Sequence, residues 1–323
     1  MRIEIWADVV CGWAYIGKRR LEKALESWDG DDAVEVVWRP YRIDPTAPDQ
    51  AEPMDEILRD PIVDAALRQC APGLSPAENQ VRVSQVAAAV GLGPRWGAAW
   101  RANSHHAHRL LTLAYAEAGA AVQDAVAERL LRAHFIEARD ISDRTVLDQI
   151  AVDAGFSAGV RLLAGSAGEE LLRDQLLHGR AMGVTSPTFV VGDRRLAGAQ
   201  APEAIREFLA AGHAESTLPT EVRRLRHAEA LLDRRDPLGA LTLLAPLLAD
   251  HGDDPNVRLL AARAYFASAQ LGRAEQLLRI LVDRSPGDAY VRHLLGRTLQ
   301  RQGRATQAAA HLRLTAAMSP DYV

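Results

Sequence analysis

Cysteine is almost absent from this 323-residue chain, which contains only Cys11 and Cys70. Two cysteines cannot form the multiple-disulfide framework of a small secreted domain, although a single bridge between them stays open. Scarce cysteine is typical of proteins in a reducing compartment. The composition therefore favours the cytoplasm as the location of the protein.

Long apolar runs and concentrated charge are absent too. No stretch approaches the roughly 20 apolar residues that cross a bilayer, and the N-terminal residues lack the apolar core of a signal peptide. The formal net charge is −4, and the arginines are interleaved with acidic residues instead of forming a basic run. We therefore expect neither a membrane nor a nucleic acid as a partner.

The residues that are present predict a folded, largely helical protein. Hydrophobic residues make up 48% of the chain and charged residues 25%, a balance typical of soluble globular proteins. The length exceeds that of a usual single domain, which predicts about two domains.

The first domain is expected over residues 1–212. Residues 2–10 alternate as a strand does, residues 12–28 change to helical spacing, and residues 33–45 return to strand composition. A right-handed crossover would set these two strands parallel in one sheet. Cys11 then lies at a strand-to-helix junction.

The rest of this domain is expected to be a helical insertion followed by a hairpin. Almost everything from about residue 53 to 182 has helical patterning, punctuated by Gly and Asp. Residues 187–199 predict two short strands joined by a Gly-Asp turn, and residues 201–212 predict a closing helix. The sequence thus predicts an α/β unit that a helical insertion divides.

A second, all-α domain is expected over residues 221–323, after a polar linker at 213–220. Its positions recur with a period of 34: Ala228, Ala262 and Gly296; Leu231, Tyr265 and Leu299; Ala240, Ala274 and Ala308; Leu244, Leu278 and Leu312. This pattern is identified as about three tetratricopeptide repeats, which bury a continuous core only when stacked. Pro255 departs from the pattern, because it falls three residues later than the period predicts.

Cys11 is a candidate nucleophile by its position. A thiol reacts as its thiolate, and the backbone N–H groups and positive dipole at a helix start favour that anion. The alternative is a small buried residue that ends a strand, which is the commoner fate of a lone cysteine.

A resemblance over about residues 1–212 favours the nucleophile. The segments "DVVCGWAYIGKRRLEKAL", "NSHHAHRLLTLAYAEAG", "RAHFIEARDISD" and "GVTSPTFVV", with "GAQ" at 198–200, resemble the FrnE-like branch of the DsbA family of thioredoxin-fold oxidoreductases. This branch is allied to the kappa-class glutathione transferases and the 2-hydroxychromene-2-carboxylate isomerases. The resemblance implies a thioredoxin-like fold and thiol chemistry at Cys11.

One departure from the family concerns the chemistry. The family's Cys-x-x-Cys motif here ends in Ala14, so the second thiol that would release a bound partner is missing. If Ala14 is native, Cys11 acts as a single thiol and needs an external thiol to resolve it. No tightly bound cofactor is expected, and a small thiol such as glutathione is the candidate resolving agent. Cys70 could replace it only if the fold brings it near.

The resemblance also implies the residues that surround the thiol. Pro187 matches the family's cis-proline, which lies opposite the reactive cysteine and shapes the substrate bed. Thr185 and Ser186 would then lie at the edge of the thiol, and Ala14 is a further candidate substrate-binding residue. For Trp13, a lid over the thiol and ordinary packing are equally good interpretations.

The neighbouring histidines invite a metal interpretation that the sequence does not favour. His105, His106 and His108 do not share one helical face, and no second ligand cluster accompanies them, so no metal is expected. They are better explained as a helix start, capped by Asn103 or Ser104. Because this stretch resembles a family segment that faces the active site, Asn103 and His108 are further candidate binding residues.

These observations support three hypotheses. The first is a DsbA-type oxidoreductase or thiol transferase that acts through Cys11, with the repeats recruiting a protein partner. The second is a kappa-transferase-like or chromene-carboxylate-isomerase-like enzyme, in which a bound small thiol carries the chemistry. The third is a redox-inactive interaction scaffold.

Overall fold

The computed structural model describes residues 1–28, 30, 33–71, 73–211 and 218–320. The chain divides into two compact units, Met1–Gly179 with Gly183–Thr217, and Arg180–Met182 with Leu218–Val323. Each unit has its own cluster of buried hydrophobic residues. Most of the predicted linker, residues 213–217, lies outside the described residues, so the predicted domain boundaries stay a prediction.

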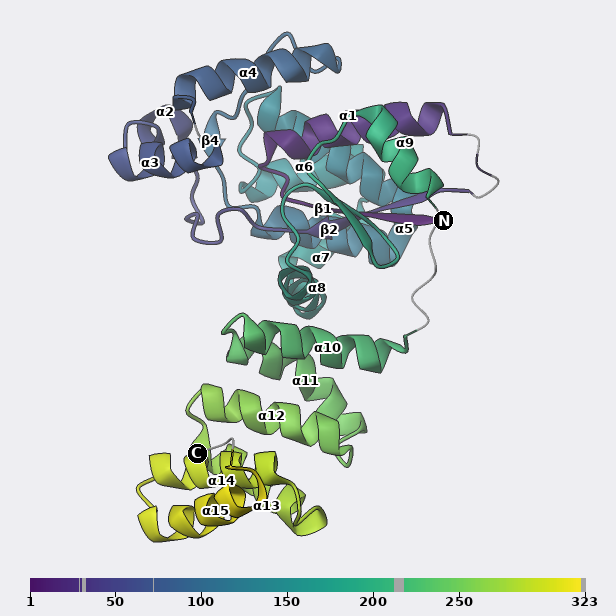
Figure 1. Ribbon diagram of the computed structural model, residues 1–323. Coiled ribbons are helices and arrows are strands. Elements are labelled where there is room, and N and C mark those ends of the chain that lie inside the picture. The colour runs from purple at the N-terminus through teal and green to yellow at the C-terminus, as the bar shows by residue number, and fades with distance from the viewer. Residues whose placement is uncertain (29, 31–32, 72, 212–217, 321–323) are drawn as a thin grey trace. The chain divides into compact units, whose positions relative to one another are not determined.

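A four-stranded sheet organises the first unit (Figure 1). Its order is β2-β1-β5-β6, with β1 and β2 parallel and the other neighbours antiparallel. The strands are β1 (Arg2–Ala7), β2 (Glu35–Pro40), β5 (Thr188–Val191) and β6 (Arg194–Ala197). The parallel pair was predicted from strand patterning and a right-handed crossover, and the closing hairpin from two short strands joined by a Gly-Asp turn. The predicted thioredoxin-like α/β fold is confirmed.

Helices cover this sheet and fill the insertion. Helix α1 (Gly12–Glu26) lies beside α9 (Pro202–Ala210), and the long α5 packs on β2. The elements of the insertion are β3 (Glu52–Pro53), α2 (Met54–Ile57), α3 (Pro61–Cys70), α4 (Pro76–Ala89), β4 (Trp100–Arg101), α5 (His105–Phe135), α6 (Arg144–Asp153), α7 (Ala158–Ala164) and α8 (Glu169–Met182).

The insertion differs in one respect from the helical prediction. Residues Glu52–Pro53 and Trp100–Arg101 form a short antiparallel ribbon that the sequence pattern did not predict. Two-residue strands are too short to produce a recognisable alternation. Within α5, Gly119 has φ 82° and interrupts the helix, in agreement with the glycine punctuation of the sequence.

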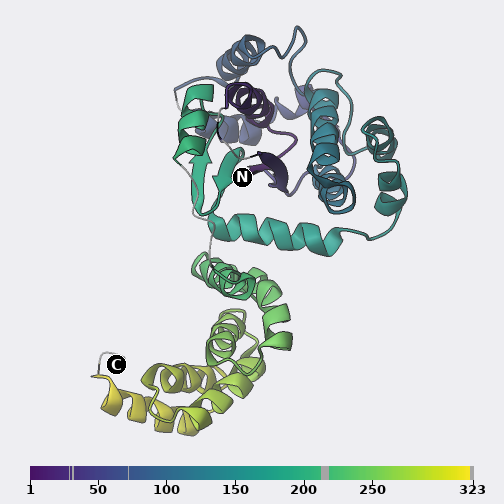
Figure 2. The ribbon, with the colours of Figure 1, turned by 90° about the vertical axis from the view of Figure 1, so that its right-hand side faces the viewer.

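Within residues 218–320, the second unit contains three helix pairs, stacked in succession (Figure 2). The helices are α10 (Thr220–Asp233), α11 (Pro237–Asp250), α12 (Pro255–Ala267), α13 (Leu271–Arg284), α14 (Ala289–Arg301) and α15 (Ala305–Met318). The small residues of the 34-residue period are buried where helices cross, which confirms the predicted repeat. Pro255 departs from the period because it opens α12, directly after the capping residue Asp254.

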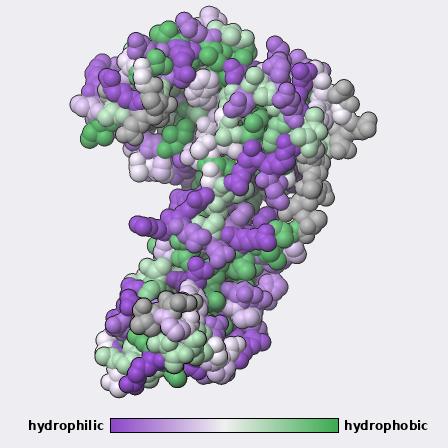
Figure 3. All heavy atoms as spheres, in the orientation of Figure 1, coloured by the Kyte–Doolittle hydropathy of each residue, from purple (hydrophilic) through white to green (hydrophobic). Residues whose placement is uncertain are grey.

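The surface of the molecule is mixed in character. Figure 3 shows hydrophilic and hydrophobic side chains interspersed on the visible face of each unit. Among the described residues, no helix has both the length and the apolar character that a bilayer span requires.

Gly296 tests the packing of the repeats. A Cβ at this position in α14 would lie 2.7 Å from Leu312 Cδ2 and 2.8 Å from its Cγ, whereas one at Gly272 in α13 would meet nothing within 4 Å. We expect Gly296→Ala to lower the free energy of unfolding by about 1 kcal/mol, because overpacking outweighs the gain in helix propensity. We expect Gly272→Ala to raise it by up to about 1 kcal/mol. Urea denaturation measures both free energies of unfolding. A change in the same direction for the two variants would contradict this packing.

Candidate active site

Cys11 is the N-cap residue of α1, in extended conformation at the end of the β1–α1 turn. Its backbone N–H donates to the carbonyl of Asp8 at 3.0 Å, and its own carbonyl accepts from Ala14 N–H at 2.9 Å. The side chain is 7% exposed. The thiol therefore lies at the strand-to-helix junction that the sequence predicted, but almost out of contact with solvent.

The segment before β5 lies against this thiol. Since β5 pairs with β1, with Thr188 opposite Trp6, the residues that precede Thr188 are brought to the end of β1. The Ser186–Pro187 peptide bond is cis, the geometry that the resemblance implies. The sulfur of Cys11 donates to the carbonyl of Ser186 at 3.6 Å. Of the predicted binding residues, Ser186 thus accepts a hydrogen bond from the sulfur.

Asp8, in the turn between β1 and Cys11, carries a buried carboxylate. Asp8 is fully buried, and its Oδ1 is 3.0 Å from Nε2 of His108 while its Oδ2 accepts from Ile43 N–H at 2.6 Å. Burial raises the pKa of Asp8, but the hydrogen bonds from His108, Ile43 and Ser104 outweigh it and hold that pKa below its usual range. The carboxylate is therefore ionised, and its charge acts on the Cys11 thiol.

The expected activation of Cys11 by the helix start is not observed in this resting fold. Burial raises the pKa of the Cys11 thiol, and the carboxylate of Asp8 raises it further. The side-chain hydroxyl of Ser186 and the backbone N–H groups of Ala14 and Trp13 lower the pKa, the latter as expected at a helix start. These local effects are the smaller ones, so the thiol is held in its protonated form.

The predicted residues around the thiol have different surroundings. Ala14 is fully buried. Trp13 is half-buried against the core, with the guanidinium of Arg82 5.5 Å from its ring centre, which favours packing over a lid. Thr185 is exposed, and its backbone N–H and C=O bond the hydroxyl of Thr188.

Asn103 organises a loop instead of contacting the sulfur. Its Oδ1 accepts from Arg42 at 2.8 Å and from His105 N–H at 3.0 Å, and its amide donates to Ala47 O at 2.9 Å. Ser104 is the N-cap residue of α5 but makes no capping side-chain bond, and the side chain of Asn103 accepts from the first backbone N–H of the helix in its place. The side chain of Cys70 lies outside the part of the chain that the structure describes, so its participation stays untested.

The sequence patterns did not single out two buried residues of this unit whose pKa values are shifted. Asp8 precedes Cys11 by three residues, and His134 lies in the segment "RAHFIEARD"; both belong to stretches that carry the family resemblance. His134 is 1% exposed, and its Nδ1 has no hydrogen-bond partner among the described residues. Burial lowers the pKa of His134 to about 4, although the carboxylates of Asp8 and Asp140 oppose the shift.

Comparisons with known proteins agree with the architecture. A family model described as DSBA-like thioredoxin domain matches residues 2–210, and a tetratricopeptide-repeat model matches residues 231–298. The uncharacterized protein YwbO of Bacillus subtilis is 23% identical over 203 residues, which are 62% of this chain and 90% of that protein.

Solved structures also resemble the first unit. The probable DsbA oxidoreductase SCO1869 of Streptomyces coelicolor is 28% identical, with a TM-score of 0.54 over 68% of this chain and 94% of that one. A 2-hydroxychromene-2-carboxylate isomerase is 17% identical, with a TM-score of 0.44 over 65% of this chain and 94% of that one. The second likeness concerns the fold alone.

Asp8→Asn should make the thiol more acidic. Removing the carboxylate charge removes one of the two causes that raise the pKa of Cys11, so the alkylation rate of Cys11 at pH 7 should increase. Mass spectrometry of the Cys11 peptide across a pH series measures this. Asp44→Asn is the matched control, because Asp44 pairs with Arg101. An unchanged or higher pKa of Cys11 in Asp8→Asn would contradict the assigned role of the carboxylate.

His134 should make the N-terminal unit sensitive to acid. Its pKa is about 4 in the fold but about 6.5 in an unfolded chain, so stability present above pH 6.5 is lost as the pH falls toward 4. The loss is roughly 3 kcal/mol at 1.36 kcal/mol per pKa unit. His134→Leu should remove this part of the pH dependence, measured by urea denaturation at pH 7 and pH 4. His251→Leu, at an exposed position, should keep the pH dependence of stability of the parent chain. If the free energy of unfolding changes equally with pH in all three chains, His134 is not the acid-sensitive group.

Proposed function

The chain belongs to the DSBA-like thioredoxin family, and from this premise we propose that it is a thiol–disulfide oxidoreductase acting through Cys11 alone. The observation that carries the proposal is the position of Cys11 at the start of α1, with its sulfur against the cis Ser186–Pro187 peptide. Position 14, where a second thiol would be needed, is a fully buried alanine.

The proposed reaction has two exchange steps. In the first, the Cys11 thiolate attacks a disulfide R–S–S–R′, so that a Cys11–S–S–R bond forms and R′–S⁻ leaves. In the second, the thiolate of an external small thiol attacks the R sulfur, which forms a disulfide between R and the external thiol and frees Cys11. One sulfur of the substrate is reduced to a thiol, and the external thiol supplies the electrons. Glutathione represents the class of small thiol required, with no tightly bound cofactor.

The residues around Cys11 have distinct roles in this proposal. Backbone N–H groups of Trp13 and Ala14 stabilise the thiolate as it forms. Ser186 and Pro187 hold the partner against the sulfur, with Thr185 exposed beside them. Trp13 supports the site by packing, while Asn103 and His108 fix its surroundings. Because burial and Asp8 raise the pKa of the thiol, the reaction rate should increase with pH past the ordinary range of a cysteine.

The same burial favours a second candidate function. A thiol that is 7% exposed and held protonated suits a protein in which Cys11 only contacts a bound small thiol, as in the transferase-like or isomerase-like alternative, or a redox-inactive scaffold. Both the small-thiol-binding hypothesis and the scaffold hypothesis predict that Cys11 in the folded chain does not form a mixed disulfide.

The repeats extend the proposal to a protein partner. Tetratricopeptide repeats stack into surfaces that typically bind proteins. We propose that α10–α15 recruit the protein on which the thiol site acts, and that neither a nucleic acid nor a membrane is a partner. We also propose that this chain works in the cytoplasm, because it has only two cysteines.

Oxidised glutathione tests the thiol mechanism in the full chain. We expect one glutathionyl group on the Cys11 peptide by mass spectrometry, at a rate that rises with pH, and its release by reduced glutathione. Cys70→Ser should behave as the parent, and Cys11→Ser should gain no adduct at residue 11. Ala14→Cys should release glutathione without added thiol, because it restores an internal resolving thiol.

One outcome would overturn the mechanism. If Cys11 stays unmodified in the folded chain up to pH 9 but reacts after denaturation, the thiol-exchange proposal fails and the small-thiol-binding or scaffold function takes its place. A circular dichroism spectrum of each variant separates this result from misfolding.

A further inference from the structure

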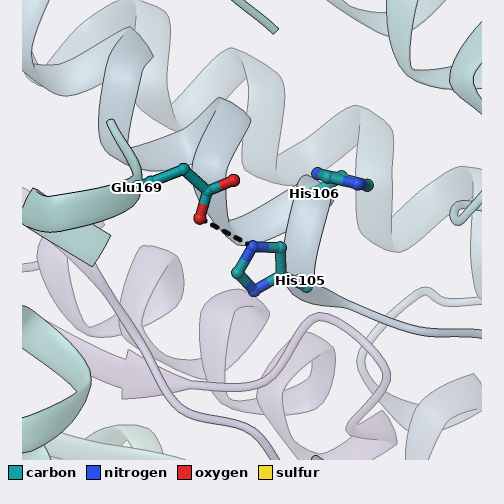
Figure 4. Close-up of side chains that lie close together, drawn as sticks. All are labelled: His105, His106 and Glu169. Carbon is teal, nitrogen blue, oxygen red and sulfur yellow. Dashed lines mark hydrogen bonds and ion pairs between the residues drawn. The ribbon is translucent and has the colours of Figure 1, made fainter. Parts of the chain in front are cut away.

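A cluster of metal-ligating side chains lies outside the thiol site, at the start of two helices. His105 and His106 begin α5, and Glu169 begins α8 (Figure 4). One ligand atom from each of the three lies within 4.8 Å of the others, and Nε2 of His105 is 2.9 Å from Oε2 of Glu169. Ligands of one metal ion are roughly 3 to 3.5 Å apart, for bonds of about 2.1 Å. The His105 and Glu169 atoms are already at such a separation, and the ring of His106 would have to turn toward them to complete the site.

A buried arginine holds the carboxylate of this cluster in place. Arg109 is 3% exposed, and its Nη1 donates to Oε1 of Glu169 at 2.9 Å. Its other N–H groups donate to backbone carbonyls of the end of α7 and of the loop before α8, including Leu163 O at 3.0 Å and Ala167 O at 2.8 Å. Glu169 thus keeps Oε1 on the arginine and turns Oε2 to His105. Metal-bound carboxylates are typically supported by such a hydrogen bond on the second oxygen.

The cluster borders a cavity of about 380 Å³. His105 and His106 line it together with Asp49, Asn103 and Arg42. An ion held by three protein ligands would therefore keep a coordination position open to the cavity.

From this geometry we propose that His105, His106 and Glu169 form a binding site for a divalent first-row transition metal ion. Two imidazoles and one carboxylate are a donor set that suits Zn²⁺ and its neighbours, and not Mg²⁺ or Ca²⁺, which take oxygen ligands. The sequence argued against a metal because three neighbouring histidines do not share a face. Glu169, 64 residues after His105, supplies the third ligand that the sequence did not reveal.

Metal binding to the full chain tests the site. The chain carries Cys11→Ser and Cys70→Ser, so that no thiol competes, and is first treated with a chelator. Calorimetric titration with Zn²⁺ should give one equivalent, and Co²⁺ should give visible absorption bands of a site with nitrogen and oxygen ligands. Zn²⁺ should also raise the melting temperature of the chain.

Single substitutions decide between this site and adventitious binding. His105→Ala, His106→Ala and Glu169→Gln should each weaken Zn²⁺ binding at least tenfold. His251→Ala, an exposed histidine of the repeat unit, should bind as the parent does. His106 is exposed, so its removal leaves the fold intact even if Glu169→Gln disturbs the contact with Arg109. No saturable binding by the parent, or unchanged affinity in His106→Ala and His105→Ala, would overturn the proposal.

Discussion

The hydrogen bond between Asp8 and His108 is the constraint on which the N-terminal unit depends. A carboxylate with no solvent exposure is tolerated only when its oxygens are fully partnered, because the unpaired charge would cost several kcal/mol. The partners come from α5 and from Ile43 after β2, while the backbone N–H of Asp8 reaches Ser186 Oγ at 2.9 Å. One residue thus joins three segments of the chain at the point where Cys11 begins α1.

The thiol at this point is subject to two opposed influences. The start of α1 stabilises a negative charge through local backbone groups, whereas the core and Asp8 disfavour it. Burial removes almost all of the water that would solvate a thiolate at Cys11. The helix dipole and the backbone N–H groups of the first turn replace only part of that stabilisation. Burial and Asp8 therefore keep the sulfur neutral, although the hydroxyl of Ser186 and the first backbone N–H groups of α1 act in the opposite direction.

The sequence predicted the elements that local patterns and internal repetition determine. The strand–helix–strand start, the closing hairpin and the 34-residue repeat follow from alternation, turn residues and periodicity, and the cis bond before Pro187 from a family resemblance. The partnership of Asp8 with His108 joins residues 100 positions apart, and that of His105 with Glu169 joins residues 64 apart. No local pattern encodes these pairs. The direction of the pKa shift at Cys11 could not be predicted from the sequence either, because it depends on how deeply the fold buries the sulfur.

The burial of Cys11 has a consequence for its chemical survival. Peroxide converts exposed thiolates to sulfenic acid, which a neighbouring thiol normally captures before it is oxidised irreversibly to sulfinic and sulfonic acids. With alanine at position 14, the first turn of α1 offers no such neighbour. A sulfur that is 7% exposed and protonated reacts slowly with peroxide. The fold thus shields the one thiol at this position from damage that the adjacent residues could not reverse.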